Sequence, residues 1–112
     1  MSKFTFEEFK NLLLQAKNFY SFKTFENYKN SESFIIMRHD ICPGVGNPLK
    51  LATIESELSI QATFFFSLDS NFYNFFSENI QSIVKQLRSL NHKIGIHFDV
   101  NKYHSEEEIM FN

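Results

Sequence analysis

The sequence predicts an α/β fold with a parallel sheet, and two observations support that prediction. Three short apolar runs begin near positions 34, 62 and 93, and a segment with helix signals follows each of the first two. A strand, a helix and the return to the next strand take roughly 30 residues in a βαβ unit, which matches this spacing. Strands that alternate with amphipathic helices pair in parallel. We therefore expect the 112 residues to form one small domain around one core.

The first predicted element is a helix over about residues 5–18. Thr5 and Glu8 have the spacing of a capping box, in which each side chain binds the other residue's backbone N–H. Apolar side chains recur at helical spacing and define the face that packs on the core. These are Phe6, Phe9, Leu13 and Ala16.

A polar segment, 21–33, is expected to be a loop, and the run "FIIM" then opens a strand over about 34–39. A short, continuous apolar run is typical of a strand covered on both faces. Asn47 at an N-cap and Pro48 at the first helical position predict that the next helix begins there.

The remaining elements repeat the pattern. "ATFFFSL" predicts a second strand over 62–68, and "KIGIHFD" predicts a third over about 93–99. Between them, apolar residues at helical spacing predict a helix that Ser77 caps and that ends at Asn91.

Composition and charge limit the class of protein. The net charge is -2 and the basic residues are scattered, so no basic surface for a nucleic acid is expected. No apolar run approaches the ~20 residues of a membrane helix, and the N-terminus lacks the features of a signal peptide. A single cysteine cannot form an internal disulfide. We therefore expect a cytoplasmic protein that binds neither nucleic acid nor membrane.

Ionisable residues follow two of the predicted strands. Arg38, His39 and Asp40 come at the end of the first strand, and His97 and Asp99 come at the end of the third. In parallel α/β folds, ligand sites lie beyond the carboxyl ends of the strands. A carboxylate with imidazoles, to which His104 adds another, suits a divalent metal such as zinc. A second carboxylate nearby would then serve as general base.

Each of these residues also has a structural interpretation, and the sequence leaves both open. His39 would orient Asp40 or bind a loop carbonyl, and Arg38 would pair with a carboxylate at the same rim. His92 would cap the C-terminus of the helix before it. His104 would be exposed in a polar tail. Cys42 would be a small buried apolar residue.

Three segments carry a resemblance to a known family. "RHDIC", "LKLATIESELSIQATFFFSLDSNFYN" and "NHKIGIHFD" occur in that order between about Phe34 and Asp99, which is more than half of the chain. Their wording and spacing resemble the polysaccharide deacetylases, also called carbohydrate esterase family four. The resemblance implies a distorted (β/α) barrel and a metal-dependent hydrolase that removes N- or O-acetyl groups from a carbohydrate.

The resemblance also assigns roles to residues. Asp40 matches the general base that takes a proton from the attacking water, and His97 matches the first metal-binding histidine. Cys42 stands where the family has an aspartate ligand, so this position is degenerate, although a thiolate also binds zinc. Asn101 stands where many members have a second histidine ligand, and His104 is a weak substitute.

The length departs from the family. Such a barrel needs seven or eight strands and typically about 250 residues, whereas this sequence predicts three strands. We therefore expect a single partial domain over 1–112 that is truncated and inactive alone. A missing C-terminal half or a homo-oligomer would complete the sheet.

Two alternatives of other classes remain. The chain could be a non-catalytic fragment or an interaction subunit with a degenerate metal site. It could also be a small binding domain of the flavodoxin or receiver type, which likewise places acidic groups at strand ends.

Overall fold

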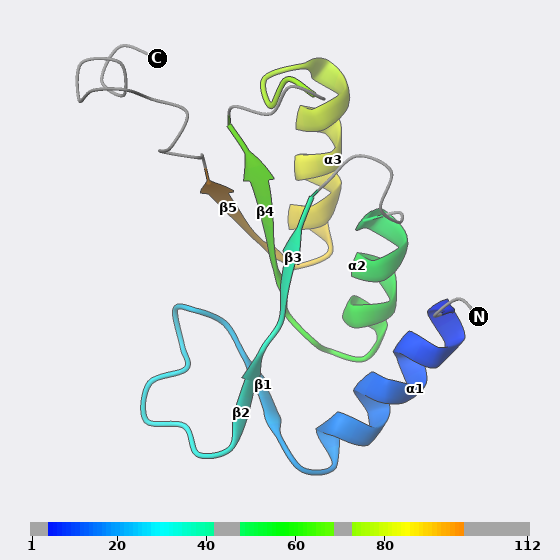
Figure 1. Cartoon of the computed structure of the whole chain (residues 1–112), viewed down its shortest axis with the longest axis vertical. Coiled ribbons are helices and arrows are strands. Elements are labelled where there is room, and N and C mark those ends of the chain that lie inside the picture. Colours follow the sequence, from blue (N-terminus) through cyan, green and yellow to red (C-terminus); the bar gives the residue numbers. More distant parts are fainter. Residues whose placement is uncertain (1–4, 42–47, 69–72, 98–112) are drawn as a thin grey trace.

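The computed structural model describes residues 5–41, 48–68 and 73–97, and shows three helices and five short strands there (Figure 1). In chain order these are α1 (Phe6–Lys17), β1 (Ser21–Lys23), β2 (Phe34–Ile36), β3 (Arg38–Asp40), α2 (Pro48–Glu57), β4 (Thr63–Ser67), α3 (Glu78–Ser89) and β5 (Lys93–His97). The fold is therefore mixed α/β, as the sequence predicts.

The predicted helix boundaries are confirmed where the sequence shows capping signals. The Thr5 hydroxyl accepts the Glu8 N–H and the Glu8 carboxylate accepts the Thr5 N–H, which completes the capping box of α1. Ser77 caps α3 by accepting the Ile80 N–H, and Asn91 follows α3 with a left-handed φ of 70°. α2 begins at Pro48, as predicted, whereas Asn47 lies outside the described residues.

The prediction of a loop throughout 21–33 is wrong at its start. Ser21–Lys23 forms β1, which pairs in parallel with β2 so that Phe22 lies opposite Ile35. Phe22 packs against the apolar cluster built on Phe9, Leu13 and Ile60. This packing is consistent with a strand in a stretch that is otherwise polar, because one partly buried aromatic residue anchors it.

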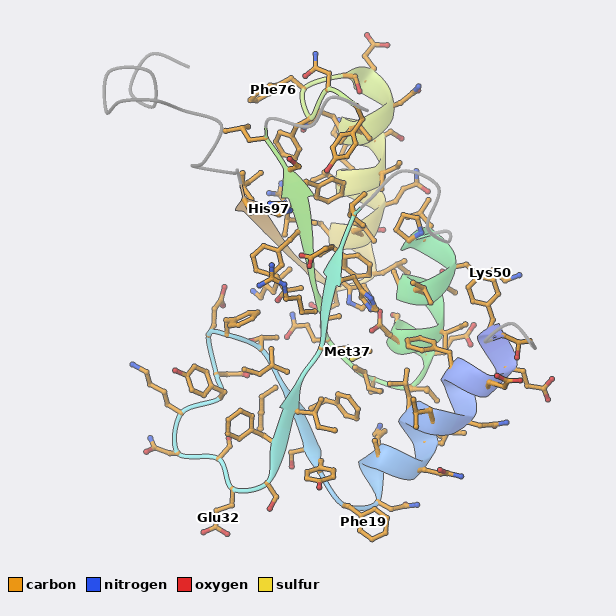
Figure 2. The ribbon with its side chains drawn as sticks, in the orientation of Figure 1. Phe19, Glu32, Met37, Lys50, Phe76 and His97 are labelled. Atoms are coloured by element: carbon orange, nitrogen blue, oxygen red, sulfur yellow. The ribbon has the colours of Figure 1, made fainter. Side chains whose placement is uncertain are left out.

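The strand predicted over 34–39 is present but divided at Met37. β2 belongs to a two-stranded sheet with β1, and β3 belongs to a three-stranded sheet with β4 and β5. Figure 2 shows Met37 at the junction of the two sheets. The Met37 carbonyl still accepts the Thr63 N–H, and its side chain packs against both apolar clusters.

The three-stranded sheet is entirely parallel, in the order β3-β4-β5. β4 and β5 confirm the predicted strands, and residues 98 and 99 of the third prediction lie outside the described part. A flavodoxin-type order would place the first of these strands between the other two. Here β3 is at the edge, so that alternative is not supported. The described strands form open sheets, so the expected partial barrel remains a proposal.

Helices lie on one side of the strands, and the main core lies between them (Figure 1). Phe64 and Phe66 of β4 are fully buried there with Leu87 of α3 and Ala52 of α2. Each fully buried Phe contributes about 1.5–3 kcal/mol relative to an exposed side chain. No helix in the described ranges has the length and apolar character that crossing a membrane requires.

His92 connects three elements of this core, and its backbone confirms the prediction that it caps the helix before it, because its N–H binds the Leu87 carbonyl just after the left-handed Asn91. Its ring is buried, with Nδ1 accepting the Ala62 N–H at 3.0 Å and Nε2 donating to the Ala52 carbonyl at 2.8 Å. These two bonds require the neutral ring with the proton on Nε2. They join the loop before β5 to α2 and to the start of β4.

A second polar contact lies under the sheet. Nε2 of His39 in β3 is 2.8 Å from Oε2 of Glu55 in α2, and Glu55 is fully buried. Oε1 of Glu55 has no hydrogen-bond partner among the described residues. Phe64 lies against the imidazole, with ring centroids 4.7 Å apart. Breaking a buried pair leaves an uncompensated polar group, which is costly.

We predict that Glu55→Ala lowers the free energy of unfolding by about 3–5 kcal/mol, because it removes the fully buried partner of the partly buried His39. Glu55→Gln keeps a hydrogen-bonding side chain of the same size and should cost less. Glu57→Ala, at an exposed position of the same helix, should change stability by less than about 0.5 kcal/mol. Denaturant unfolding measures all three. Equal stability of the Glu55→Ala and Glu57→Ala variants would show that the contact contributes nothing.

Candidate functional site

The candidate site is the face of the three-stranded sheet opposite the helices. Side chains alternate between the faces of a strand, and residues paired in register share a face. His39 contacts α2, so Arg38 and Asp40 lie on the opposite face. The register of β4 and β5 adds Ser67 and His97 to that face.

Arg38 and Asp40 form an ion pair at the end of β3, as one of the structural interpretations anticipates. Arg38 Nη2 and Nε donate to Asp40 Oδ1 at 2.9 and 3.1 Å. Both side chains are about half exposed, so the pair contributes at most about 1 kcal/mol to stability. Its effect is to orient the carboxylate, because both donors act on the same oxygen.

An aromatic ring supports this ion pair from β4. The Arg38 guanidinium carbon lies 4.1 Å from the centroid of the Phe65 ring, which is a cation–π contact. Phe25, from the β1–β2 connection, meets the Phe65 ring edge-to-face at 5.9 Å. Phe65 in turn crosses the backbone of Gly95 in β5, where an added Cβ would lie 2.4 Å from the ring. Gly95 therefore allows the ring that carries Arg38 to lie flat on the sheet.

A tyrosine holds the carboxyl ends of β3 and β4 together. The Tyr73 hydroxyl accepts the Ser67 N–H at 2.6 Å and donates to the Ile41 carbonyl at 3.2 Å. The Leu68 N–H then binds the His97 carbonyl, which extends the pairing of β4 with β5 to the end of the strand. No sequence motif indicated this role of Tyr73, because its partners lie on two other elements.

The positions of Asp40 and His97 relative to each other decide whether they can share a ligand. Both lie at the carboxyl ends of their strands and on one face, and Figure 2 shows His97 at the end of β5. Their strands are not neighbours, because β4 lies between β3 and β5. With strands about 4.8 Å apart and a rise of about 3.3 Å per residue, the register places their Cα atoms about 12 Å apart.

The other predicted site residues divide into two groups. His39 points to the helical side and contacts Glu55, so the interpretation that it orients Asp40 or binds a loop carbonyl is wrong. Cys42, Asp99, Asn101 and His104 lie outside the described residues. Among the residues that are described, no group of three or more His, Cys, Asp or Glu side chains gathers around a common point.

A pocket of about 210 Å³ opens on the same face, toward the amino ends of β4 and β5. Phe25 and Phe65 form much of its wall, and Lys93 and Glu26, whose side chains pair at 3.3 Å, also line it. It is therefore separated from the Asp40 end of the sheet by the Phe65 ring.

We predict that Gly95→Val disturbs the rim through Phe65, because the new side chain would occupy the volume of the ring. The variant should lose about 1–3 kcal/mol of stability through overpacking. Combining it with Phe65→Ala should recover part of that loss, which a double-mutant cycle measures. Additive effects of the two substitutions would show that the ring does not require a glycine at this position.

Comparison with known proteins assigns neither a family nor a function to this site. No protein-family model matches the chain, and no curated protein or solved structure matches it.

Proposed function

We propose that this chain carries part of the active site of a metal-dependent hydrolase of the polysaccharide deacetylase type. Its substrate would be a carbohydrate bearing N- or O-acetyl groups. The observation that supports this proposal best is that Asp40 and His97 lie on one face of a parallel sheet, at the carboxyl ends of their strands. Active sites of (β/α) barrels form at that end of the strands.

In this proposal Asp40 is the general base. Its carboxylate is half exposed, so a water molecule can reach it, and Arg38 fixes its orientation through Oδ1. A base must lie within hydrogen-bond reach of the proton that it takes, which makes orientation as important as basicity. Phe65 keeps Arg38 over the sheet and thereby restricts the conformations of the pair.

His97 is the proposed metal ligand on β5. Its residue is exposed at the strand end, and an imidazole with a carboxylate is a donor set that zinc accepts. Cys42 and His104 are the further ligands proposed from the sequence. When bound, the metal would supply a Lewis acid for the acyl carbonyl. His97 would help to hold the ion, and Asp40 would take up the proton.

A second candidate is an interaction subunit without catalysis, and the open sheets favour it. β3 and β5 are edge strands of the described sheet, and edge strands pair readily with other chains. For both candidate functions, we propose a cytoplasmic location, as the sequence predicts.

Zinc binding tests the proposed hydrolase. We predict that titration of the wild-type chain with zinc shows saturable binding and that His97→Ala lowers the zinc affinity at least about tenfold. Mutation of a residue that only hydrogen-bonds to a metal ligand already lowers metal affinity about 10–100-fold. Glu57→Ala, which removes an exposed carboxylate from α2, should bind as the wild type does. Calorimetry or competition with a chromogenic chelator gives the affinities.

Acetyl release from a chitooligosaccharide provides the second measurement. If a preparation with bound zinc releases acetate, Asp40→Ala should abolish the release while the protein stays folded. A wild-type chain that binds no zinc, or a His97→Ala variant with unchanged affinity, would contradict the proposed metal site.

A further inference from the structure

β1 and β4 pair with the same edge of the segment 34–40. The carbonyl of Ser33 faces β1, and the carbonyl of Met37 and the N–H of Ile41 face β4. The N–H and C=O groups of a strand alternate between its two edges, so all odd-numbered residues here face one way. The groups of the even-numbered residues, including Ile36 and Arg38, point to the other edge. No strand in the described ranges pairs there.

β5 presents the second open edge. The N–H of Lys93 binds Ala62, and the carbonyl of His97 binds Leu68, so the odd-numbered residues of β5 face β4. The backbone groups of Ile94 and Ile96 therefore point outward, and no described strand pairs with them. The two open edges belong to one parallel sheet and run in the same direction.

Register and side-chain chemistry make the two edges compatible. On the face opposite the helices, β3 carries Arg38 and Asp40, which pair with each other, while β5 carries His97 and also Lys93, which pairs with Glu26. A register that sets His97 beside Asp40 of a second copy also sets Gly95, which the Phe65 ring of its own copy covers, beside the second copy's Arg38. The same register places Ile36 of the second copy next to Lys93, at the rim of the pocket that Phe25 and Phe65 line.

We propose that the chain self-associates by strand addition, with β5 of one copy pairing in parallel with β3 and the end of β2 of a second copy. The contact is heterologous, and two copies satisfy both of their open edges if the arrangement closes on itself. It makes His97 of one copy and Asp40 of the other adjacent across the seam, whereas β4 separates them within a copy. The inference that these two residues form a zinc-dependent site across the seam rests on the proposed function, whereas the inference of self-association does not.

Amide hydrogen exchange on the wild-type chain tests the pairing directly. The N–H groups of Ile36, Arg38, Ile94 and Ile96 should gain protection as the protein is concentrated from the micromolar to the millimolar range, because they point to the open edges. The N–H of Gly95 faces β4 and should be protected throughout. Rapid exchange of these four amides at every concentration would overturn the proposal, and so would their protection in a protein that sedimentation shows to be monomeric.

A matched pair of substitutions separates backbone pairing from general stickiness. Ile96 is 44% exposed, and Ile96→Pro removes its outward N–H without removing a bond to β4. Ile96→Thr keeps the N–H and reduces the apolar surface. Sedimentation velocity should show association of the wild type and the Thr variant and a monomer for the Pro variant. Equal loss of association in both variants would overturn strand pairing in favour of apolar contact.

Mixing two variants tests the shared site. Asp40→Ala copies lack the proposed base and His97→Ala copies lack the proposed ligand, but a mixed pair contains one seam with both groups intact. With zinc supplied, the mixture should therefore release acetate from a chitooligosaccharide, although neither variant does so alone. Association without any zinc binding by the wild type would contradict the proposed function and leave the interface standing. A mixture that releases no more acetate than the separate variants, while the wild type releases it, would overturn the shared site.

Discussion

The buried contact between His39 and Glu55 sets the orientation of β3, and the arrangement of the rim depends on that orientation. With the imidazole directed toward α2, strand geometry directs Arg38 and Asp40 to the opposite face. A slip of one residue in pairing would exchange the two faces. It would bury the Arg38–Asp40 ion pair and expose an imidazole in its place, which the fully buried partner Glu55 opposes.

Local sequence signals were sufficient for the helices and for most strands. Capping residues are read from three or four consecutive positions, so Thr5, Glu8, Pro48 and Ser77 indicated the helix starts correctly. β1 was missed because its pairing partner is β2 and because Phe22 is the one apolar residue among its three. The first predicted strand divides at Met37, where the apolar β2 gives way to the ionisable residues of β3, and this change was not predicted to be a boundary.

The roles of the histidines depended on distant partners. His39 meets a carboxylate sixteen positions away and His92 a carbonyl forty positions away, and no spacing rule connects these pairs. By contrast, the parallel topology alone predicted that Asp40 and His97 would share one end of the sheet. Parallel topology alone did not predict the strand order, in which β4 lies between β3 and β5.

The joint at Met37 divides the chain into two sheets with separate hydrogen-bond ladders. The ladder between β1 and β2 has three residue pairs, and its strands are close in the sequence. The three-stranded sheet surrounds the most buried aromatic side chains, Phe64 and Phe66. Native proteins open in cooperative units of unequal free energy. We therefore expect the N-terminal ladder to open at a lower free energy than the elements around β4, which carry the most buried side chains.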